Sequence, residues 1–124
     1  MPAVLSRDAP IFEIPGVTFT GLTSPSRGSQ ENSVWRFVVQ PGTPGKAHRV
    51  TREETFVALH GCALLQVDGV SHMLPAGSAF AVPADSLLLL SNPGTEPFHA
   101  MAVLPVGGQV VTEDAATFTP PWAV

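Results

Sequence analysis

Short apolar runs separated by Gly and Pro dominate the chain from Ser33 onward. Runs of this length, bounded by turn residues and repeated at short intervals, are typical of strands in a sandwich or barrel. We expect strands at 34–40, 54–59, 63–67, 70–74, 79–82, 87–90 and 98–104. No segment shows a capped apolar period of 3.6 residues, although Glu113 to Phe118 could form one helical turn. The pattern predicts an all-β domain.

Two reversals are visible inside this strand-rich region. His60-Gly61 interrupts the apolar run from Phe56 to Val67, and Asp68-Gly69 separates that run from the next one. Asp-Gly between two β segments is a strong signal for a two-residue hairpin turn. We therefore expect three consecutive antiparallel strands.

The chain divides into three parts within one domain. Its 124 residues are close to the commonest domain size and leave no room for a second domain. Residues 1–33 read as an N-terminal arm with β-like pieces at 11–13 and 17–22, residues 34–104 as the barrel core, and residues 105–124 as a tail. In the tail, Pro120 and Pro121 exclude a central strand, and we expect Trp122 to fill an apolar edge of the barrel.

Composition and charge narrow the classes of partner. The chain is 44% hydrophobic and only 13% charged, with a net charge of −4. Charges are scattered singly, so there is no basic stripe for nucleic acid and no attraction to an anionic membrane surface. No apolar run approaches the roughly 20 residues that span a bilayer. We expect a cytoplasmic protein, and its one cysteine, Cys62, excludes an internal disulfide.

The stretch from 42 to 61 resembles the first cupin motif. That motif has a Gly, five residues, His-x-His, three or four residues, Glu, six residues and a Gly. Gly42, His48, Glu54 and Gly61 stand at matching intervals, while Val50 occupies the second His position.

The stretch from 77 to 92 resembles the second cupin motif, which has a Gly, five residues, Pro-x-Gly, two residues, His, three residues and Asn. Gly77, Pro83 and Asn92 match, whereas Asp85 replaces the second Gly and Leu88 replaces the His. The resemblance covers residues 34–104. It implies a double-stranded β-helix, or jelly-roll barrel, with a ligand pocket inside one end.

In metal-binding cupins, the two His and the Glu of the first motif and the His of the second motif hold one divalent ion. Carried over to this chain, only His48 and Glu54 have donor atoms, and two ligands hold an ion weakly. We therefore expect no resident metal or other cofactor. A weak ion at these two residues, or a relocated site completed by His99, is the alternative. His60 and His72 are interpreted as surface or turn histidines. By strand parity, His60 falls on the side of Glu54, but about 20 Å away from it.

His48 and Glu54 could also act without metal. A carboxylate that is hydrogen-bonded to an imidazole fixes its tautomer and raises its basicity, which gives a general base near neutral pH. Such a catalytic pair suits isomerisation, cyclisation or elimination on a small molecule. The alternatives are a relic pair in a barrel that only binds a small molecule, and a structural or regulatory module.

The remaining candidate residues point to an apolar or aromatic ligand. Val50 and Leu88 at the vacated ligand positions, together with Phe56 and Met101, would make the pocket apolar. Arg36 interrupts an apolar strand. It could hold a ligand carboxylate if it points inward, and an outward, solvated side chain is the alternative.

We also expect a homodimer. The N-terminal arm and the apolar strand edges of a small barrel need to be covered, and a symmetric contact, in which each arm pairs with the partner's sheet, would cover both.

Overall fold

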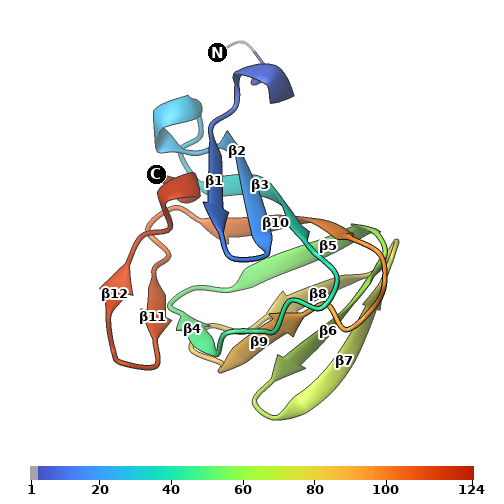
Figure 1. Cartoon of the computed structure of the whole chain (residues 1–124). Coiled ribbons are helices and arrows are strands. Elements are labelled where there is room, and N and C mark those ends of the chain that lie inside the picture. Colours follow the sequence, from blue (N-terminus) through green and yellow to red (C-terminus); the bar gives the residue numbers. More distant parts are fainter. Residues whose placement is uncertain (1–2) are drawn as a thin grey trace.

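The computed structural model describes residues 3–124 as two six-stranded antiparallel sheets (Figure 1). The first sheet has the order β1 (Ile11–Ile14), β2 (Val17–Thr23), β3 (Asn32–Val39), β10 (Phe98–Pro105), β5 (Glu54–His60) and β8 (Ala79–Val82). The second has the order β12 (Thr117–Phe118), β11 (Val110–Thr112), β4 (His48–Val50), β9 (Leu88–Ser91), β6 (Cys62–Val67) and β7 (Val70–Pro75). The fold is an all-β jelly-roll barrel, as the sequence predicts.

The helical content of the described residues consists of three short 3-10 turns. They are η1 (Ser6–Asp8), η2 (Pro25–Arg27) and η3 (Pro121–Ala123). Among residues 3–124, no helix has the length and apolar character required to cross a membrane.

Alternation along the two central strands of the first sheet builds the core. On β3, Trp35, Phe37 and Val39 are buried, while Arg36 between them is exposed. On the neighbouring β10, Phe98 is fully buried, and every second residue after it also points inward. Because successive side chains of a strand alternate between faces, the inward set of both strands packs between the sheets. The jelly roll therefore has an aromatic interior on this side.

The predicted run of three antiparallel strands is only partly correct. Asp68 and Gly69 have φ angles of 49° and 82°, and they join β6 and β7 as the expected hairpin. In contrast, β5 does not pair with β6. The chain crosses from the first sheet to the second at Gly61, and β5 pairs with β10 and β8 instead. The strands before and after Gly61 both carry buried residues. Because β5 and β6 lie in opposite sheets, these residues face the same core between the two sheets.

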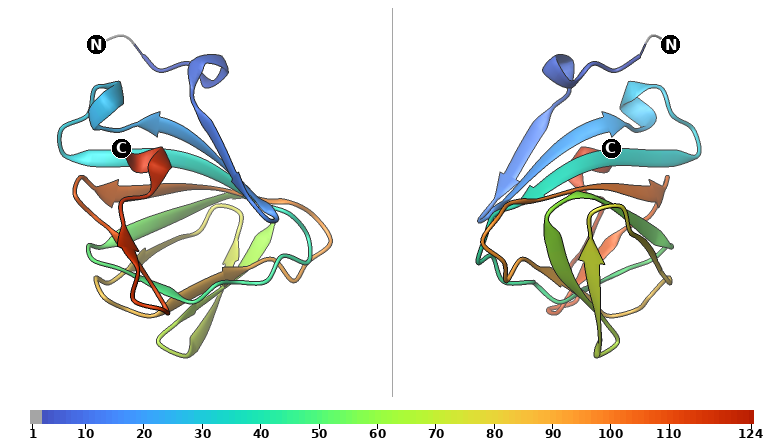
Figure 2. Two further views of the ribbon diagram at one scale, coloured as in Figure 1. Left: turned by 60° about the vertical axis from the view of Figure 1, so that its left-hand side comes forward. Right: turned by 90° about the vertical axis from the view of Figure 1, so that its right-hand side faces the viewer.

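The N-terminal arm strands and the C-terminal turn η3 meet on the first sheet. The arm strands β1 and β2 extend this sheet beside β3, and η3 packs against β1, β2 and β3 (Figure 2). The helical turn expected at 113–118 is absent there, because this stretch forms the end of β11's hairpin with β12. Pairing of β11 with β4 as well as with β12 places this hairpin at the edge of the second sheet.

Candidate functional site

A cavity of about 740 Å³ opens between the two sheets at one end of the barrel. Its wall is mostly apolar, and its polar side chains are few. The apolar and aromatic lining residues include Val17, Phe19, Trp35, Phe37, Val39, Val50, Phe56, Leu88, Leu90, Val110, Phe118 and Trp122. The volume lies within the range of small-molecule sites, and an apolar wall with a few polar groups is their usual composition.

His48 reaches this cavity from β4. Its Nδ1 lies 2.8 Å from the carbonyl oxygen of Lys46, so the proton of a neutral imidazole resides on Nδ1 and is donated to that carbonyl. The pKa of His48 is lowered by burial, which outweighs the raising effect of the bond to Lys46. The ring is thus neutral near pH 7, with the lone pair on Nε2.

Glu54 begins β5 and lines the same cavity. The residue is 6% exposed, and no hydrogen bond or ion pair of its side chain contributes to its pKa. Burial raises the pKa of the Glu54 carboxyl to about 8, because the charged form loses its water without gaining a partner. Glu54 is therefore mostly protonated at neutral pH and can donate a proton.

The structure corrects the expected interaction between these two residues. No hydrogen bond joins His48 to Glu54 in the described part of the chain, since His48 Nδ1 bonds the Lys46 carbonyl and Glu54 is without a partner. The pair is consequently a neutral base and a neutral acid in one apolar cavity. It is not an imidazole activated by a carboxylate.

Val50 and Leu88, which stand where the two cupin motifs have His, both reach this cavity. Val50 is 3% exposed, Leu88 is 1% exposed, and both line the cavity. Leu88 is also the cross-strand partner of His48 between β9 and β4. Across residues 3–124, no group of three or more His, Cys, Asp or Glu side chains is placed to hold a metal ion. The donors at this position do not fit the four-ligand site of metal-binding cupins.

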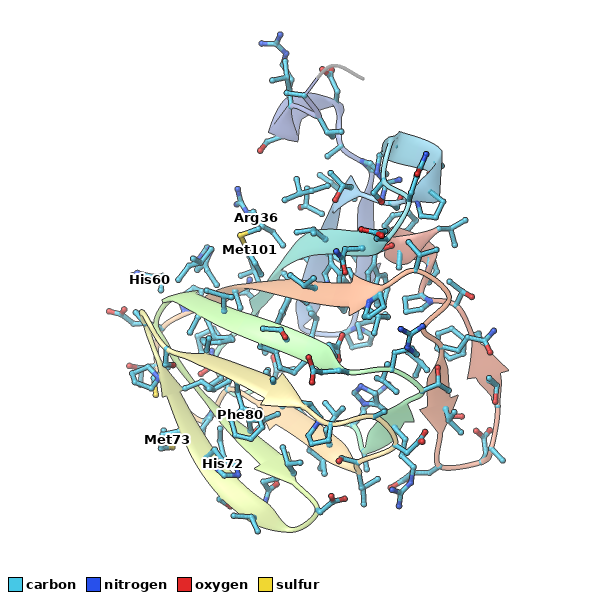
Figure 3. The ribbon with its side chains drawn as sticks, turned by 180° about the vertical axis from the view of Figure 1, so that it is seen from behind. Arg36, His60, His72, Met73, Phe80 and Met101 are labelled. Carbon is cyan, nitrogen blue, oxygen red and sulfur yellow. The ribbon has the colours of Figure 1, made fainter. Side chains whose placement is uncertain are left out.

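Three of the expected ligand-binding residues lie outside this cavity. Arg36, His99 and Met101 are on the outer face of the first sheet, and Figure 3 shows Arg36 and Met101 pointing away from the barrel. Their positions follow from alternation, because the inward places on β3 and β10 belong to the buried residues on either side of them. His99 therefore does not complete a site with His48.

His60 is also on the outer face, contrary to the parity argument. The pairing of β10 with β5 shifts between His99 and Ala100, so Leu59 is an extra residue and the alternation of β5 breaks there. The rings of His60 and His99 lie 5.4 Å apart, and His60 Nε2 is 3.6 Å from the Glu96 carboxylate. His60 and His99 line a shallow surface groove together with Arg36 and Leu59.

His72 packs against Phe80 at the other end of the barrel. Their ring centroids are 4.6 Å apart, and Figure 3 shows the two side chains together between β7 and β8. His72 is half-buried, which differs from the expected surface or turn histidine. Phe80 is partly buried against the core and does not line the large cavity.

Several lining residues were not predicted from the sequence. Phe19 comes from the N-terminal arm, and Phe118 comes from the tail, and neither segment contains a residue of the two cupin motifs. The inward orientation of Trp35 and Phe37 could be predicted from the sequence, because these residues flank Arg36 in a strand with alternating faces. If Arg36 is solvated, both neighbours must face the interior.

Three exposed charged residues also line the cavity. They are Lys46, which precedes β4, and Glu113 and Asp114 of the β11–β12 hairpin. Hydrogen bonds, chiefly from the Thr112 hydroxyl, lower the pKa of Asp114, so this carboxylate stays ionised at neutral pH. The entrance is polar, whereas the interior is apolar.

The other motif residues support the scaffold. Asn92 is fully buried, and its side-chain amide donates to the carbonyls of Val39 and Glu96 at 2.9 and 2.8 Å. Asp85, which stands where the motif has a Gly, has a φ of 65°. Asp is one of the few residues other than Gly that tolerate this left-handed conformation.

The sequence comparison identifies the family. The cupin domain family matches residues 35–104, which is more than half of the chain. The chain belongs to the cupin family. A comparison with curated protein sequences finds no match.

Solved structures share the fold at low sequence identity. The polyketide cyclase RemF from Streptomyces resistomycificus is 18% identical, with a TM-score of 0.77 over 98% of this chain and 88% of that one. A predicted oxalate decarboxylase from Thermotoga maritima is 19% identical, with a TM-score of 0.73 over 85% and 99%. An RmlC-like cupin from Shewanella frigidimarina is 20% identical, with a TM-score of 0.71 over 82% and 86%. These likenesses concern the fold.

Proposed function

We propose that this cupin binds a small apolar or aromatic molecule in the barrel cavity without a resident metal. The observation that carries the proposal is the apolar cavity of about 740 Å³ that contains His48 and Glu54 and has aliphatic side chains at the vacated ligand positions. Burying an apolar ligand there is favourable, and the two polar groups would orient its polar end.

Uptake of 2-naphthol, an aromatic molecule with one hydroxyl group, tests this proposal by fluorescence titration. Val110 lines the cavity, and its neighbour Val111 does not. Because adjacent residues of β11 face opposite sides, Val110→Trp should fill the cavity and weaken binding roughly tenfold or more, while Val111→Trp should not. Equal affinities of both variants and the parent would place the ligand elsewhere and contradict the proposal.

The proposed absence of a resident metal is tested by measuring the metal content of the protein. Protein purified without added metal should contain far less than one equivalent of Fe, Mn, Zn or Ni by elemental analysis, because two donors hold a divalent ion weakly. A near-stoichiometric metal content that disappears in His48→Ala would contradict this expectation and favour a metal enzyme.

Acid–base catalysis is the second candidate function, favoured by the protonation states at the site. His48 Nε2 can accept a proton from the carbon next to a ligand carbonyl, while protonated Glu54 gives its proton to the carbonyl oxygen. The product is the enol, with an imidazolium and a carboxylate that exchange a proton to restore the site. Isomerases, cyclases and lyases use such steps, and one structural neighbour is described as a polyketide cyclase.

Exchange of the acidic C–H protons of 2-tetralone in D2O, followed by NMR, tests this chemistry. The wild-type protein should accelerate the exchange. His48→Gln and Glu54→Gln should each reduce the acceleration by roughly a hundredfold, the usual contribution of a general acid or base. Val111→Trp, which leaves the cavity unchanged, is the control. Equal exchange rates in the wild type and the three variants would contradict acid–base catalysis and leave binding as the proposed function.

The homodimer is part of the proposal. The edge strand β1 pairs only with β2 in the described chain, and Ile11 on it is 62% exposed. Within the first sheet the arm already pairs with its own chain, so a partner would cover the free edge of β1 or the outer face of the sheet.

A further inference from the structure

The last residues of the chain supply one wall of the cavity. Pro120 and Trp122 line it, yet they lie beyond β12 and belong to neither sheet. Figure 2 shows this segment, in red, beside the strands of the N-terminal arm. All other aromatic lining residues are carried by strands, so this wall needs a separate means of support.

Trp122 is held partly by aromatic packing. Its ring stacks on Phe19 with a centroid distance of 3.6 Å and an interplanar angle of 3°, and Phe12 and Trp35 lie 6.3 Å away. Its indole Nε1 is buried and has no hydrogen-bond partner in the described residues. The N–H therefore does not position the ring. The ring is positioned by its aromatic packing and by the backbone of η3.

Arg27 holds that backbone. Its guanidinium donates to the Trp122 carbonyl from Nη2 at 3.0 Å and to the Leu22 carbonyl from Nε at 3.1 Å. Gly21 makes room for this arrangement, since a Cβ there would lie 2.5 Å from Arg27 Nη2 and 3.1 Å from the Trp122 carbonyl oxygen. The N-terminal arm is thus shaped to bind the backbone at Trp122.

Two buried hydroxyl groups hold the residues that follow. Ser33 donates to the Ala123 carbonyl at 2.9 Å, and Ser24 donates to the Val124 carbonyl at 2.7 Å. Ser33 is 1% exposed and Ser24 is fully buried. Three consecutive carbonyls therefore accept bonds from one side, so the wall is fixed relative to the first sheet.

We propose that Trp122 is a specificity-determining residue, which limits the size of the aromatic ligand, and that Arg27 is a positioning residue that acts through it. This inference rests on the proposed binding function. A fixed aromatic wall favours compact ring systems that contact it. Once the wall is removed or loosened, small ligands lose contact area, and larger ring systems gain space.

The experiment compares affinities for 2-naphthol and the four-ring 1-hydroxypyrene, which carry the same single hydroxyl group. Trp122→Ala should shift the affinity ratio toward 1-hydroxypyrene roughly fivefold or more. Arg27→Ala and Gly21→Ala should shift it in the same direction by less, and Trp122→Phe and Arg27→Lys should recover part of the preference. Arg49→Ala is the matched control, because Arg49 also donates to a backbone carbonyl, that of Asp85, away from this wall.

A second readout needs no ligand. In a Trp35→Phe background, Trp122 is the only tryptophan, and acrylamide quenching of its fluorescence should increase in Arg27→Ala and Gly21→Ala but not in Arg49→Ala. Unchanged quenching in both variants would overturn the positioning role. An unchanged affinity ratio in Trp122→Ala and Trp122→Phe would overturn the specificity role, although binding itself would stand. A wild-type protein that takes up neither probe would refute the proposed function and this inference with it.

Discussion

A buried carboxyl group without a partner makes the stability of the fold depend on pH. The pKa of Glu54 is about 8 in the folded chain, against an ordinary value of 4.5 that applies when the chain unfolds. Between these values the folded state binds more protons, so the free energy of unfolding falls as pH rises, and the loss is complete above about pH 8. His48 acts in the opposite sense below pH 6.5, because its pKa is lowered.

Urea unfolding at pH 6.5 and pH 8.0 isolates the contribution of Glu54. Relative to Glu54→Gln, the wild-type protein should lose up to about 2 kcal/mol between these two values, at about 1.4 kcal/mol per pH unit. Glu53→Gln, which changes the exposed neighbouring residue, should retain the wild-type dependence. If wild type and Glu54→Gln respond equally to pH, Glu54 is ionised in the folded protein at neutral pH.

Restoring the two missing imidazoles tests whether the four motif positions converge. The variant Val50→His with Leu88→His should bind Ni2+ or Zn2+ roughly a hundredfold more tightly than the parent, because four donors replace two. The new polar groups should also weaken 2-naphthol binding. Isothermal titration measures the affinity, and adding His48→Ala should abolish the gain. If the double variant binds metal no better than the parent, the four positions do not face one centre.

Among the elements, two glycine turns that look alike in the sequence tolerate an added side chain to different degrees. Gly61 and Gly69 both have φ near 80°, but an added Cβ at Gly61 would lie 2.6 Å from the Pro97 carbonyl oxygen, whereas Gly69 has open space. Gly69→Ala should therefore cost about 1–2 kcal/mol for the left-handed conformation alone. Gly61→Ala should cost more, because a backbone clash is added.

Urea denaturation midpoints of Gly61→Ala and Gly69→Ala provide the comparison. Equal costs would mean that the crossing between the two sheets relaxes away from Pro97 without loss, in contrast to the close approach seen in the structure.

The sequence predicts the strands that form apolar or alternating runs bounded by Gly, Pro or other turn residues, from long ones such as 34–40 and 98–104 to short ones such as 79–82. β4 was missed because His48-Arg49-Val50 is too short to show a period, and β11 and β12 were missed for the same reason. Motif spacing nevertheless brought His48, Val50, Glu54 and Leu88 to one cavity. The contribution of Trp122 depends on hydrogen bonds between distant segments, which no local pattern encodes.

At the scale of the whole molecule, we predict that two chains associate as a homodimer. Light scattering at micromolar concentration should give the mass of two 13 kDa chains. Ile11→Lys places a charge on the exposed edge strand β1 and should shift the protein toward a single chain. Val70→Lys, on β7 at an edge of the second sheet, is a matched control, since Val70 is 58% exposed. A single-chain mass for the wild type would contradict the homodimer.

The pairing of β3 with β10 also has a consequence for the order in which the molecule forms. It joins residues 32–39 to residues 98–105 at the centre of the first sheet, so a long stretch of chain must close before the β1–β2–β3 half of this sheet joins the half formed by β10, β5 and β8. The β6–β7 hairpin, whose partners are adjacent, can form without that closure. Contacts between distant segments slow folding into the range of roughly milliseconds to seconds. Stopped-flow fluorescence of Trp35, in a Trp122→Phe background, should report this late closure, because Trp35 on β3 pairs with Ala102 on β10 and is only 3% exposed in the folded chain.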